Sequence, residues 1–359
     1  MKNTIDRLID SSREVIFDCV LDNGGIVAAN STKKYYPQEA KNYFYVWPRD
    51  AAFTCLAAQA LGINDIQENF FDWLMERAED WQEKGLFYEK YYPHGGKALL
   101  KLQPDQTGVV IYAAYQYFQK HGNNAKRIEK LITHSADGIC RAWNNDYFKT
   151  ITNDIWEERL TFPDTKDNFS YSLAACIKGL HCAHKISTNK KYLKAAEQME
   201  EALIKAIKKI GYIPRSFGLL NDERIDASAL GLIWPFEIIK PNHPAAKKTI
   251  QLIEKKLTDN FKVKRYENDD YDGWMYENIH CKKGSGYWPL LNFWLAIVLT
   301  KMNKKTKALK YYNQVLKSLD NKYIPEQIFD NKIQKSISPL CWSHVMFVLA
   351  SKKLGLLKK

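Results

Sequence analysis

The sequence lacks the patterns that mark several classes of enzyme and metalloprotein. It has no CxxC pair, no His/Cys cluster at metal-ligand spacing, no glycine-rich phosphate loop and no Ser/His/Asp order typical of a hydrolytic triad. Its seven cysteines are scattered at positions 19, 55, 140, 176, 182, 281 and 341. Dispersed cysteines within apolar patterns predict buried free thiols in a reducing compartment. We therefore expect neither a metal nor a cofactor.

Long apolar runs are also missing, and none approaches the length of a membrane span. Charged side chains are spread through residues 1–19, which excludes the apolar core of a signal peptide in that segment. The sequence thus predicts a cytoplasmic protein that does not contact a membrane.

Positive charge is abundant, with a formal net charge of +12 over 359 residues. The lysines gather in helical runs such as 190–191, 205–209, 255–256 and 304–307, a distribution typical of a solvated outer surface. No DNA- or RNA-binding motif accompanies them, so we expect no nucleic-acid partner. Binding of an anionic polymer stays open as an alternative, and it would depend steeply on salt.

Segments with helical periodicity recur from end to end, and no strand pattern is convincing. Uncharged segments alternate with charged ones. A helix that is apolar all round must be buried, whereas a helix with a polar face lies outside. The uncharged segments are 51–61, 106–118, 171–183, 227–236, 288–300 and 339–350, and the charged ones are 4–19, 66–84, 124–144, 190–209, 245–259 and 303–318.

This alternation predicts an all-α fold, an (α/α)6 toroid of six inner and six outer helices, in a single domain over residues 1–359. A superhelical repeat array is the structural alternative. Its repeats would resemble one another, and these segments do not.

Clusters of acidic, basic and aromatic residues precede the predicted inner helices. In a closed toroid the N-terminal ends of these helices meet on one face, where helix dipoles also favour negative charge. The clusters should therefore converge on one site. Asp50, Asp105 and Asp226 are also placed to cap their helices. The clusters lie at 47–50, 103–105, 154–158, 224–226, 265–273 and 325–327.

The segment 153–159 is the densest cluster, because it places four ionised side chains and an indole in seven positions. Charged connections that carry a large aromatic residue are typical places for a binding site. Aromatic rings stack on the apolar faces of a sugar, and charged groups bond to its hydroxyls. Two carboxylates from different loops suit glycoside cleavage. The histidines are isolated, and we expect His344 to be a satisfied core residue.

Three segments resemble signature segments of the glucoamylase family, glycoside hydrolase family 15. They are Phe44-Tyr45-Val46-Trp47-Pro48-Arg49-Asp50, Asp154-Ile155-Trp156-Glu157-Glu158-Arg159 and Ile324-Pro325-Glu326-Gln327. Supporting matches at 102–105, 226–228, 265–267 and 338–344 follow in the family order. The resemblance covers roughly residues 20 to 355 and implies the family's catalytic (α/α)6 barrel.

The resemblance also implies roles for individual residues. Glu157 matches the family's general acid, and Glu326 matches the general base that activates water on the opposite face of the sugar ring. Inversion requires two such carboxyl groups to lie about 6.5–9.5 Å apart. The residues expected to bind substrate are Trp47, Arg49, Asp50, Asp105, Trp156, Glu158, Arg265 and Trp288.

Some local interactions stay open at this point. Gln327 follows the expected base and would help to orient it. Glu158 would either contact the substrate or form a structural pair with Arg159. Glu326 would cap the turn near Pro325 if its role were structural.

The chain also departs from the family pattern. We expect neither the N-terminal β-sandwich domain that many prokaryotic members carry nor a starch-binding module. The fifth loop holds an insertion at 274–287, after which Trp288 takes the place of a family tryptophan. Linkage and chain-length preference therefore stay open.

Together these observations predict an inverting α-glucosidase that releases β-glucose from malto- or isomalto-oligosaccharides without a cofactor. Its partner would be the oligosaccharide, and its oligomeric state is left open. Trehalose hydrolysis within the same family is one alternative. A non-catalytic carbohydrate-binding or regulatory toroid is another, although the presence of both Glu157 and Glu326 argues against it.

Overall fold

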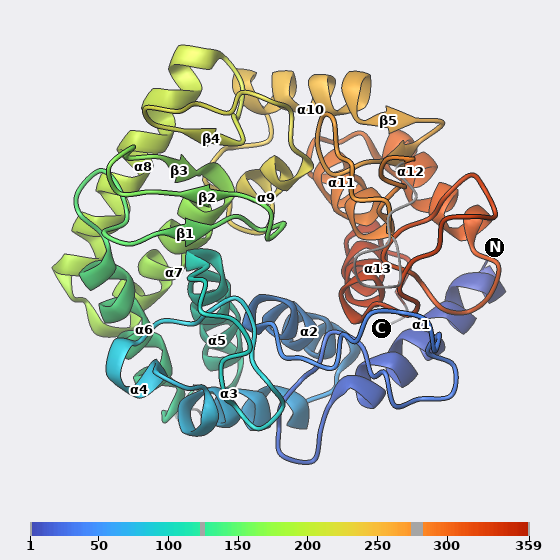
Figure 1. Ribbon diagram of the computed structural model, residues 1–359, viewed down its shortest axis with the longest axis horizontal. Helices are drawn as coiled ribbons and strands as arrows, with labels where there is room; N and C mark the ends of the chain where they lie inside the picture. The colour runs from blue at the N-terminus through green and yellow to red at the C-terminus, as the bar shows by residue number, and fades with distance from the viewer. Residues whose placement is uncertain (1, 123–125, 274–282, 358–359) are drawn as a thin grey trace.

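The computed structural model describes residues 2–122, 126–273 and 283–357. Within these ranges an inner ring of helices lies inside an outer ring (Figure 1). Each inner helix is followed along the chain by an outer helix, except that the last inner helix packs against the first outer one. The predicted (α/α)6 toroid is therefore confirmed.

The inner helices are apolar on all sides, as burial between neighbours requires. In α11, for example, every residue from Pro289 to Leu299 is buried. The inner ring consists of α2 (Pro48–Leu61), α5 (Pro104–His121), α7 (Ser170–Ser187), a 3-10 turn (Ala227–Ala229) that continues into α9 (Leu230–Ile233), α11 (Pro289–Lys301) and α13 (Cys341–Leu354).

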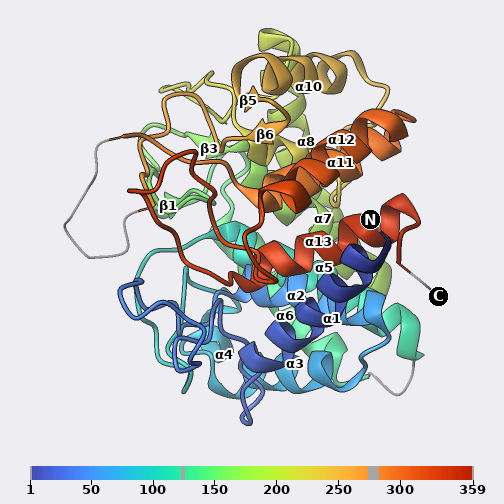
Figure 2. The ribbon, with the colours of Figure 1, turned by 90° about the vertical axis from the view of Figure 1, so that its right-hand side faces the viewer.

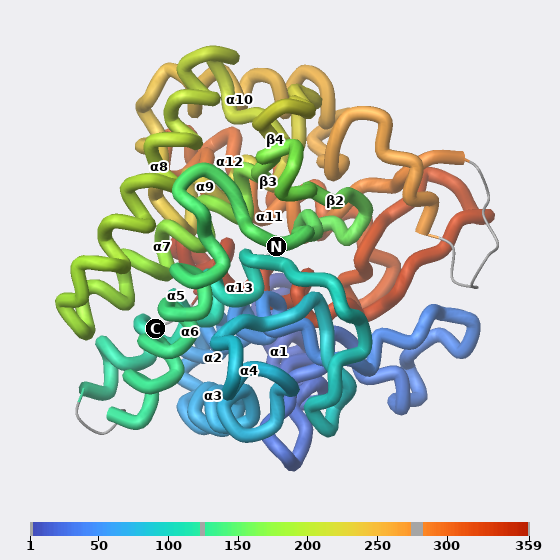
Figure 3. The backbone as a smooth tube through the Cα atoms, turned by 60° about the vertical axis from the view of Figure 1, so that its left-hand side comes forward, coloured from blue at the N-terminus to red at the C-terminus, as the bar shows by residue number. Residues whose placement is uncertain are grey.

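The outer helices are amphipathic. On α8 an apolar stripe faces α7, while Lys205, Lys208 and Lys209 are exposed, as the lysine runs predict. Figure 3 shows α8 outside α7. The outer ring consists of α1 (Lys2–Cys19), α3 (Asp65–Arg77), α6 (Ile128–Ala142), α8 (Lys190–Ile210), α10 (Pro244–Lys256) and α12 (Lys305–Ser318).

The ring closes where α1 packs on α13, and His344 fastens this contact. Its Nδ1 lies 2.9 Å from Ser12 Oγ on α1, and its Nε2 accepts the backbone N–H of Ile324 at 2.9 Å. Burial lowers the pKa of His344 to about 3, so the ring is neutral. His344 is the satisfied core residue that the sequence predicted.

Glycines allow two inner helices to approach closely. A Cβ at Gly108 on α5 would lie 2.4 Å from the backbone of Ala175 on α7, and a Cβ at Gly179 would lie 3.0 Å from the carbonyl oxygen of Gly108. Because no side chain fits between the two backbones, this contact requires glycine at Gly108.

Two predicted helices are interrupted or shortened. The segment 66–84 divides into α3 and the single turn α4 (Trp81–Lys84), because Ala78 is extended with ψ 111° and Asp80 takes a left-handed φ of 68° between them. The segment 227–236 ends at Ile233. Pro235 disfavours a helical residue before it, and Trp234 is accordingly extended, with φ −151° and ψ 132°.

Short strands, which the sequence did not predict, connect some of the loops. They are too short for an alternating apolar pattern to show. The pairs are all antiparallel: β1 (Thr152–Asn153) with β2 (Leu160–Thr161), β3 (Asn168–Phe169) with β4 (Ser216–Phe217), and β5 (Thr258–Asp259) with β6 (Lys262–Val263).

The loops that carry β1 to β4 gather at the face where the inner helices begin (Figure 2). This face therefore holds the polar clusters of the sequence. Across the part of the chain that is described, no helix is both long and apolar enough to cross a bilayer.

Candidate active site

The segment 153–159 folds into a hairpin loop between β1 and β2, and Asp154 organises it. Asp154 Oδ1 accepts the backbone N–H groups of Glu158 (2.9 Å) and Arg159 (3.1 Å), and Oδ2 accepts from Arg215 Nη2 (2.5 Å). Glu157 has a φ of 65°, a left-handed conformation that costs energy in a residue with a side chain. The bonds around Asp154 hold the loop in this conformation, which turns the Glu157 side chain into a pocket.

That pocket has a volume of about 340 Å³, and residues at the starts of inner helices, such as Arg49, Asp50 and Trp288, line it. Ligand pockets in proteins range over about 300–1,000 Å³, so this one is small. Side chains far apart in the sequence meet in it. The sequence-predicted residues that line it are Trp47, Arg49, Asp50, Trp156, Glu157, Glu158, Arg265, Trp288 and Glu326.

Glu157 lies in surroundings that favour its protonated form. Trp47 Nε1 donates a hydrogen bond of 2.6 Å to Glu157 Oε1, which by itself favours the ionised form, but burial and charge outweigh it. Burial raises the pKa of Glu157 well above its ordinary value, and the negative charge of Glu89 raises it further. Lys90 and Arg49 lower it and only partly oppose these effects.

Glu326 lies in the same pocket but is surrounded by hydroxyl donors. Tyr43 Oη donates to Oε1 at 3.1 Å, and Tyr271 Oη donates to Oε2 at 3.3 Å. Burial raises the pKa of Glu326 above its ordinary value, and the Tyr43 bond, the charge of Arg265 and the Tyr271 bond oppose this rise only in part. Glu157 and Glu326, two of the carboxyl groups that line the pocket, therefore differ in their neighbours: a negative charge raises the pKa of Glu157 further, and hydroxyl donors oppose the rise at Glu326.

The expected role of Gln327 is not what the structure shows. Its Oε1 accepts the backbone N–H of Gly286 at 2.8 Å, so its amide fastens the loop that leads to α11. Tyr43 and Tyr271 hold Glu326 instead. Because these are side-chain bonds within the pocket, Glu326 does not act as a cap for the turn at Pro325.

Asp105 lies behind the pocket wall, which corrects its expected place in contact with substrate. It is 0% exposed, and its Oδ2 accepts from Arg49 Nη1 at 3.1 Å while Oδ1 accepts from Ser172 Oγ at 3.2 Å. Arg49 Nε also donates to Asp50 Oδ1 at 3.0 Å. Burial raises the pKa of Asp50 to about 6 against the opposing charge of Arg49. Asp105 thus fixes the guanidinium that reaches the pocket.

Capping occurs at one of the three predicted aspartates. Asp226 accepts the backbone N–H of Ser228 at 2.7 Å and also the indole N–H of Trp156 at 3.0 Å. Asp50 and Asp105 do not cap, because their helices begin at Pro48 and Pro104 and both aspartates fall inside the first turn. The capping expectation was wrong for these two.

Glu158 pairs with Arg265 rather than with Arg159. Arg265 Nη2 donates to Glu158 Oε1 at 2.6 Å, and Tyr266 Oη donates to Oε2. The guanidinium carbon of Arg265 also lies 4.9 Å from the Trp288 ring centre, a cation–π contact. Arg159 Nε lies 3.9 Å from Asp222. Glu158 and Arg265 thus form one charged wall of the pocket.

Trp288 lines the pocket as expected, although the insertion before it lies partly outside the described residues, since 274–282 are not among them. The Trp288 and Trp156 ring centres are 5.7 Å apart. These two indoles form an aromatic wall next to the charged one.

Sequence reasoning missed several residues that surround the two carboxyl groups. Tyr43 directly precedes a signature segment, so its place could have been inferred. Glu89 and Lys90 carry no local signal, because contacts between distant segments bring their loop to the 153–159 hairpin: Leu102 pairs with Thr152, Gln103 Nε2 donates to the Asp154 carbonyl oxygen at 2.7 Å, and Asn153 Nδ2 donates to Glu89 Oε2 at 2.7 Å. The missed residues are Lys41, Tyr43, Glu89 and Lys90, whereas Tyr271 and Trp342 lie in the segments 265–273 and 338–344 that the sequence singled out, although neither was named as a site residue.

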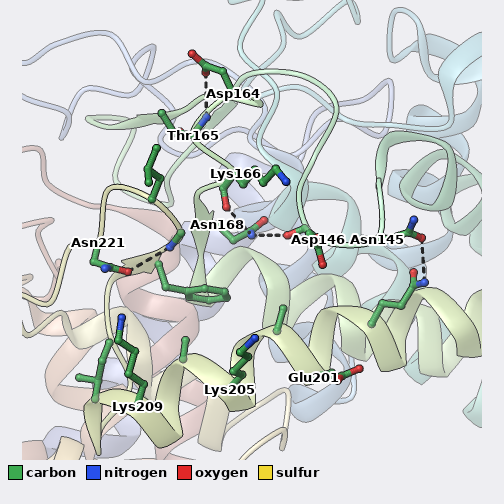
Figure 4. Close-up of a pocket in the computed structure, with 17 residues that line it drawn as sticks. Asn145, Asp146, Asp164, Thr165, Lys166, Asn168, Glu201, Lys205, Lys209 and Asn221 are labelled. Carbon is green, nitrogen blue, oxygen red and sulfur yellow. Dashed lines mark hydrogen bonds between the residues drawn. The ribbon is translucent and has the colours of Figure 1, made fainter.

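A larger hollow of about 820 Å³ lies elsewhere, between α8 and the loops at 145–146, 164–168 and 217–221 (Figure 4). Its wall mixes amides and lysines such as Asn168, Lys205 and Lys209 with acidic and apolar side chains. None of the predicted site residues lines it. It belongs to the outer ring, and the smaller pocket is the candidate active site.

Metal chemistry has no obvious place in the described residues, since no group of three or more His, Cys, Asp or Glu side chains there could hold an ion. The candidate site consists of carboxyl groups, guanidinium groups, hydroxyls and indoles. Such a set can bind a sugar and move protons.

The chain as a whole is similar to known glycosyl hydrolases. An uncharacterized glycosyl hydrolase from Methanocaldococcus jannaschii is 27% identical over 91% of this chain and 52% of that protein, so the chain spans about half of that relative's length. An isomaltose glucohydrolase from Kribbella flavida is 20% identical over 87% of this chain and 85% of that protein.

A solved structure shares the fold. It is a glycosidase variant in complex with glucose, with a TM-score of 0.79 and 20% identity, and the match covers 99% of this chain and 98% of that chain. The sequence model of glycosyl hydrolases family 15 matches residues 21–352. That match covers nearly the whole chain, and the signature segments predicted the same family. The protein therefore belongs to glycosyl hydrolase family 15.

Proposed function

We propose that this protein is an inverting exo-acting α-glucosidase that releases β-glucose from the non-reducing ends of malto- or isomalto-oligosaccharides. The observation that carries the proposal is the contrast between two carboxyl groups in one pocket. Burial raises the pKa of both groups; the charge of Glu89 adds to the rise at Glu157, whereas the bonds from Tyr43 and Tyr271 and the charge of Arg265 oppose it at Glu326. Neighbours that push two pKa values apart are how an acid and a base are assigned in such sites.

Glu157 is the general acid in this proposal. It gives its proton to the glycosidic oxygen as the bond from C1 to that oxygen breaks, and the electron pair of the bond stays with the leaving sugar. Burial and the charge of Glu89 raise the pKa of Glu157, which keeps the proton available near neutral pH.

Glu326 is the general base. It takes a proton from a water molecule that attacks C1 on the face opposite the leaving group, which inverts the anomeric configuration. The hydroxyls of Tyr43 and Tyr271 stabilise its ionised form and fix its orientation.

Recognition of the terminal sugar falls to the remaining walls. Arg49 and Asp50 are bonded to each other at the end of the pocket next to α2, and Glu158 and Arg265 form the opposite charged pair. Charged groups held in place by partners bond well to sugar hydroxyls, since little side-chain entropy is left to lose. The small pocket volume favours a chain end over an internal segment.

The test is a time course of glucose release from maltotriose, isomaltotriose and trehalose, with the anomer identified by proton NMR. We expect β-glucose as the initial product from one of the first two and no release by Glu157→Gln. Initial α-glucose would overturn the inverting mechanism. Release from trehalose alone would assign the alternative substrate, and binding without release would favour the regulatory toroid.

A further inference from the structure

Two lysines, Lys41 and Lys90, line the candidate active site and are only partly buried. Lys90 Nζ is 4.9 Å from the ring centre of Trp47, and Lys41 Nζ is 5.4 Å from that of Tyr271. Tyr43 connects the two rings, since its ring centre is 5.4 Å from that of Trp47 and its hydroxyl oxygen is 3.4 Å from that of Tyr271. The pocket thus contains a row of three aromatic side chains with a lysine at each end.

Depth separates the two lysines from the arginine at the closed end of the pocket. The side chain of Arg49 is 3% exposed, whereas that of Lys90 is 21% exposed and Lys41 is half-buried. An exo-acting enzyme takes the terminal sugar into the deep end, so the leaving half of the substrate, the part beyond the cleaved bond, extends toward solvent. Trp47, which contacts Lys90, also donates to the proposed acid Glu157, the group that protonates the leaving oxygen. The lysines therefore lie beside the leaving half of the substrate.

The arginines of the pocket are matched by carboxylates more fully than the lysines are. Each of the two arginines that line the pocket has two carboxylates within 3.1 Å, which are Asp50 and Asp105 for Arg49 and Glu158 and Asp269 for Arg265. Within the described ranges, Lys90 has one carboxylate partner, Glu89 at 3.6 Å, and Lys41 has none. An ammonium group has three donors, so both lysines retain the capacity to bind a ligand.

The proposed mechanism gives Lys90 no role of its own. Its charge lowers the pKa of Glu157, which opposes retention of the proton that the acid must give. Lys41 differs, because its charge helps to keep the base Glu326 ionised. A neutral sugar does not require an ammonium group beside it. An oxyanion on the leaving half of the substrate would pair with Lys90 and cancel its effect on the acid.

We propose that Lys90, assisted by Lys41, binds an oxyanion on the leaving half of the substrate, so that the preferred substrate is an α-glucoside whose leaving group carries a carboxylate or a phosphate. This inference rests on the proposed function and names the class of its leaving group. A hydrogen bond from an ammonium to an oxyanion is about twice as strong as one between neutral groups. Because both lysines are partly exposed, an anion can reach them without full loss of its hydration. Neutral oligosaccharides remain substrates with a lower kcat/KM.

The experiment compares substrates that differ only in the charge of the leaving group. Maltobionate has a carboxylate where maltitol has a hydroxymethyl group, and α-maltose 1-phosphate has a phosphoryl group where methyl α-maltoside has a methyl group. The isomaltose derivatives, or trehalose 6-phosphate against trehalose, take their place if the wild type cleaves only those linkages. We expect kcat/KM to be about tenfold or more higher for the charged member of a pair. Preference for the carboxylate or for the phosphate identifies the group.

Variants test whether the lysines cause this preference. Lys90→Met removes the charge and should bring the ratio of the two kcat/KM values close to one. Lys90→Arg keeps the charge and should retain most of the preference, and Lys41→Met should reduce it less than Lys90→Met does. The matched control is Lys208→Met on the exposed face of α8, which should leave the ratio unchanged. Because the ratio is measured within one variant, a structural defect that lowers both values alike does not alter it.

The outcomes separate this inference from the proposed function. A wild type that releases glucose from none of the substrates overturns the proposed function. A wild type that cleaves the neutral members as well as, or better than, the charged ones overturns the inference alone, and this result requires no variant to fold. A preference that persists in both Lys90→Met and Lys41→Met also overturns it. If Lys90→Met does not fold, salt dependence decides, because partly exposed lysines are screened and a ratio that added salt leaves unchanged would not come from them.

Discussion

The two sides of the pocket place a glutamate carboxyl group in different surroundings. Glu157 and Glu326 are both carboxyl groups whose pKa burial raises. On one side Glu89 adds a negative charge, and on the other Tyr43 and Tyr271 add hydrogen-bond donors. Burial alone would make both groups acids. The difference teaches that neighbours, more than depth, assign the roles of the two glutamates.

The largest expected effect comes from removing either carboxyl group. Glu157→Gln and Glu326→Gln should each lower kcat by about 100-fold or more, because each deletes one proton transfer. Binding of an oligosaccharide, measured by calorimetry, should change little. The matched control is Glu201→Gln on the outer ring, which should retain wild-type kcat. Equal loss of turnover and of binding would mean that these side chains are structural.

An intermediate effect is expected from Tyr43→Phe, which removes one donor from Glu326 and leaves the ring in place. The Tyr43 bond lowers the pKa of Glu326, so its loss should raise that pKa. Because the base must be ionised, the acidic limb of the kcat/KM profile should move to higher pH by about one unit.

The alkaline limb should stay where it is in Tyr43→Phe, since that limb reports the acid. A shift of the alkaline limb alone would break the division between the two sides of the pocket. Circular dichroism of the variant checks that the fold is retained.

The smallest effect is expected from Lys41→Met. Lys41 lowers the pKa of Glu326 through its charge, so its removal should also move the acidic limb to higher pH. Lys41 is only half-buried, so solvent screens it, and the shift should stay below about half a unit and shrink in added salt. A shift as large as that of Tyr43→Phe would mean that charge, not hydrogen bonding, governs the base.

Much of the fold could be predicted because the signal is long. The alternation of uncharged and charged segments extends along the whole chain, and burial selects for it in every helix pair. Strands of two residues are too short to leave an alternating apolar pattern in the sequence. Single residues decided where two of the predicted helices end. Asp80 breaks one helix by its left-handed backbone, and Pro235 ends another.

The site residues were predictable only where several of them lie together in one contiguous segment of the sequence. The hairpin at 153–159 and the segment around Glu326 have recognisable composition. Asp105 shared a motif with residues of the pocket, but its helix aims it at Arg49. Glu89 has no motif at all, and its place depends on the bridge between two loops.

The amino-acid sequence by itself determined the ring of paired helices and the end of the ring that carries the polar clusters. These follow from local patterns, because hydrophobic burial acts on each helix separately. Only the tertiary structure decided that Glu89 stands beside Glu157 and that Tyr43 and Tyr271 stand beside Glu326. The strength of a buried charge or hydrogen bond depends on distances of a few ångströms between distant segments, and these distances exist only after the ring has closed.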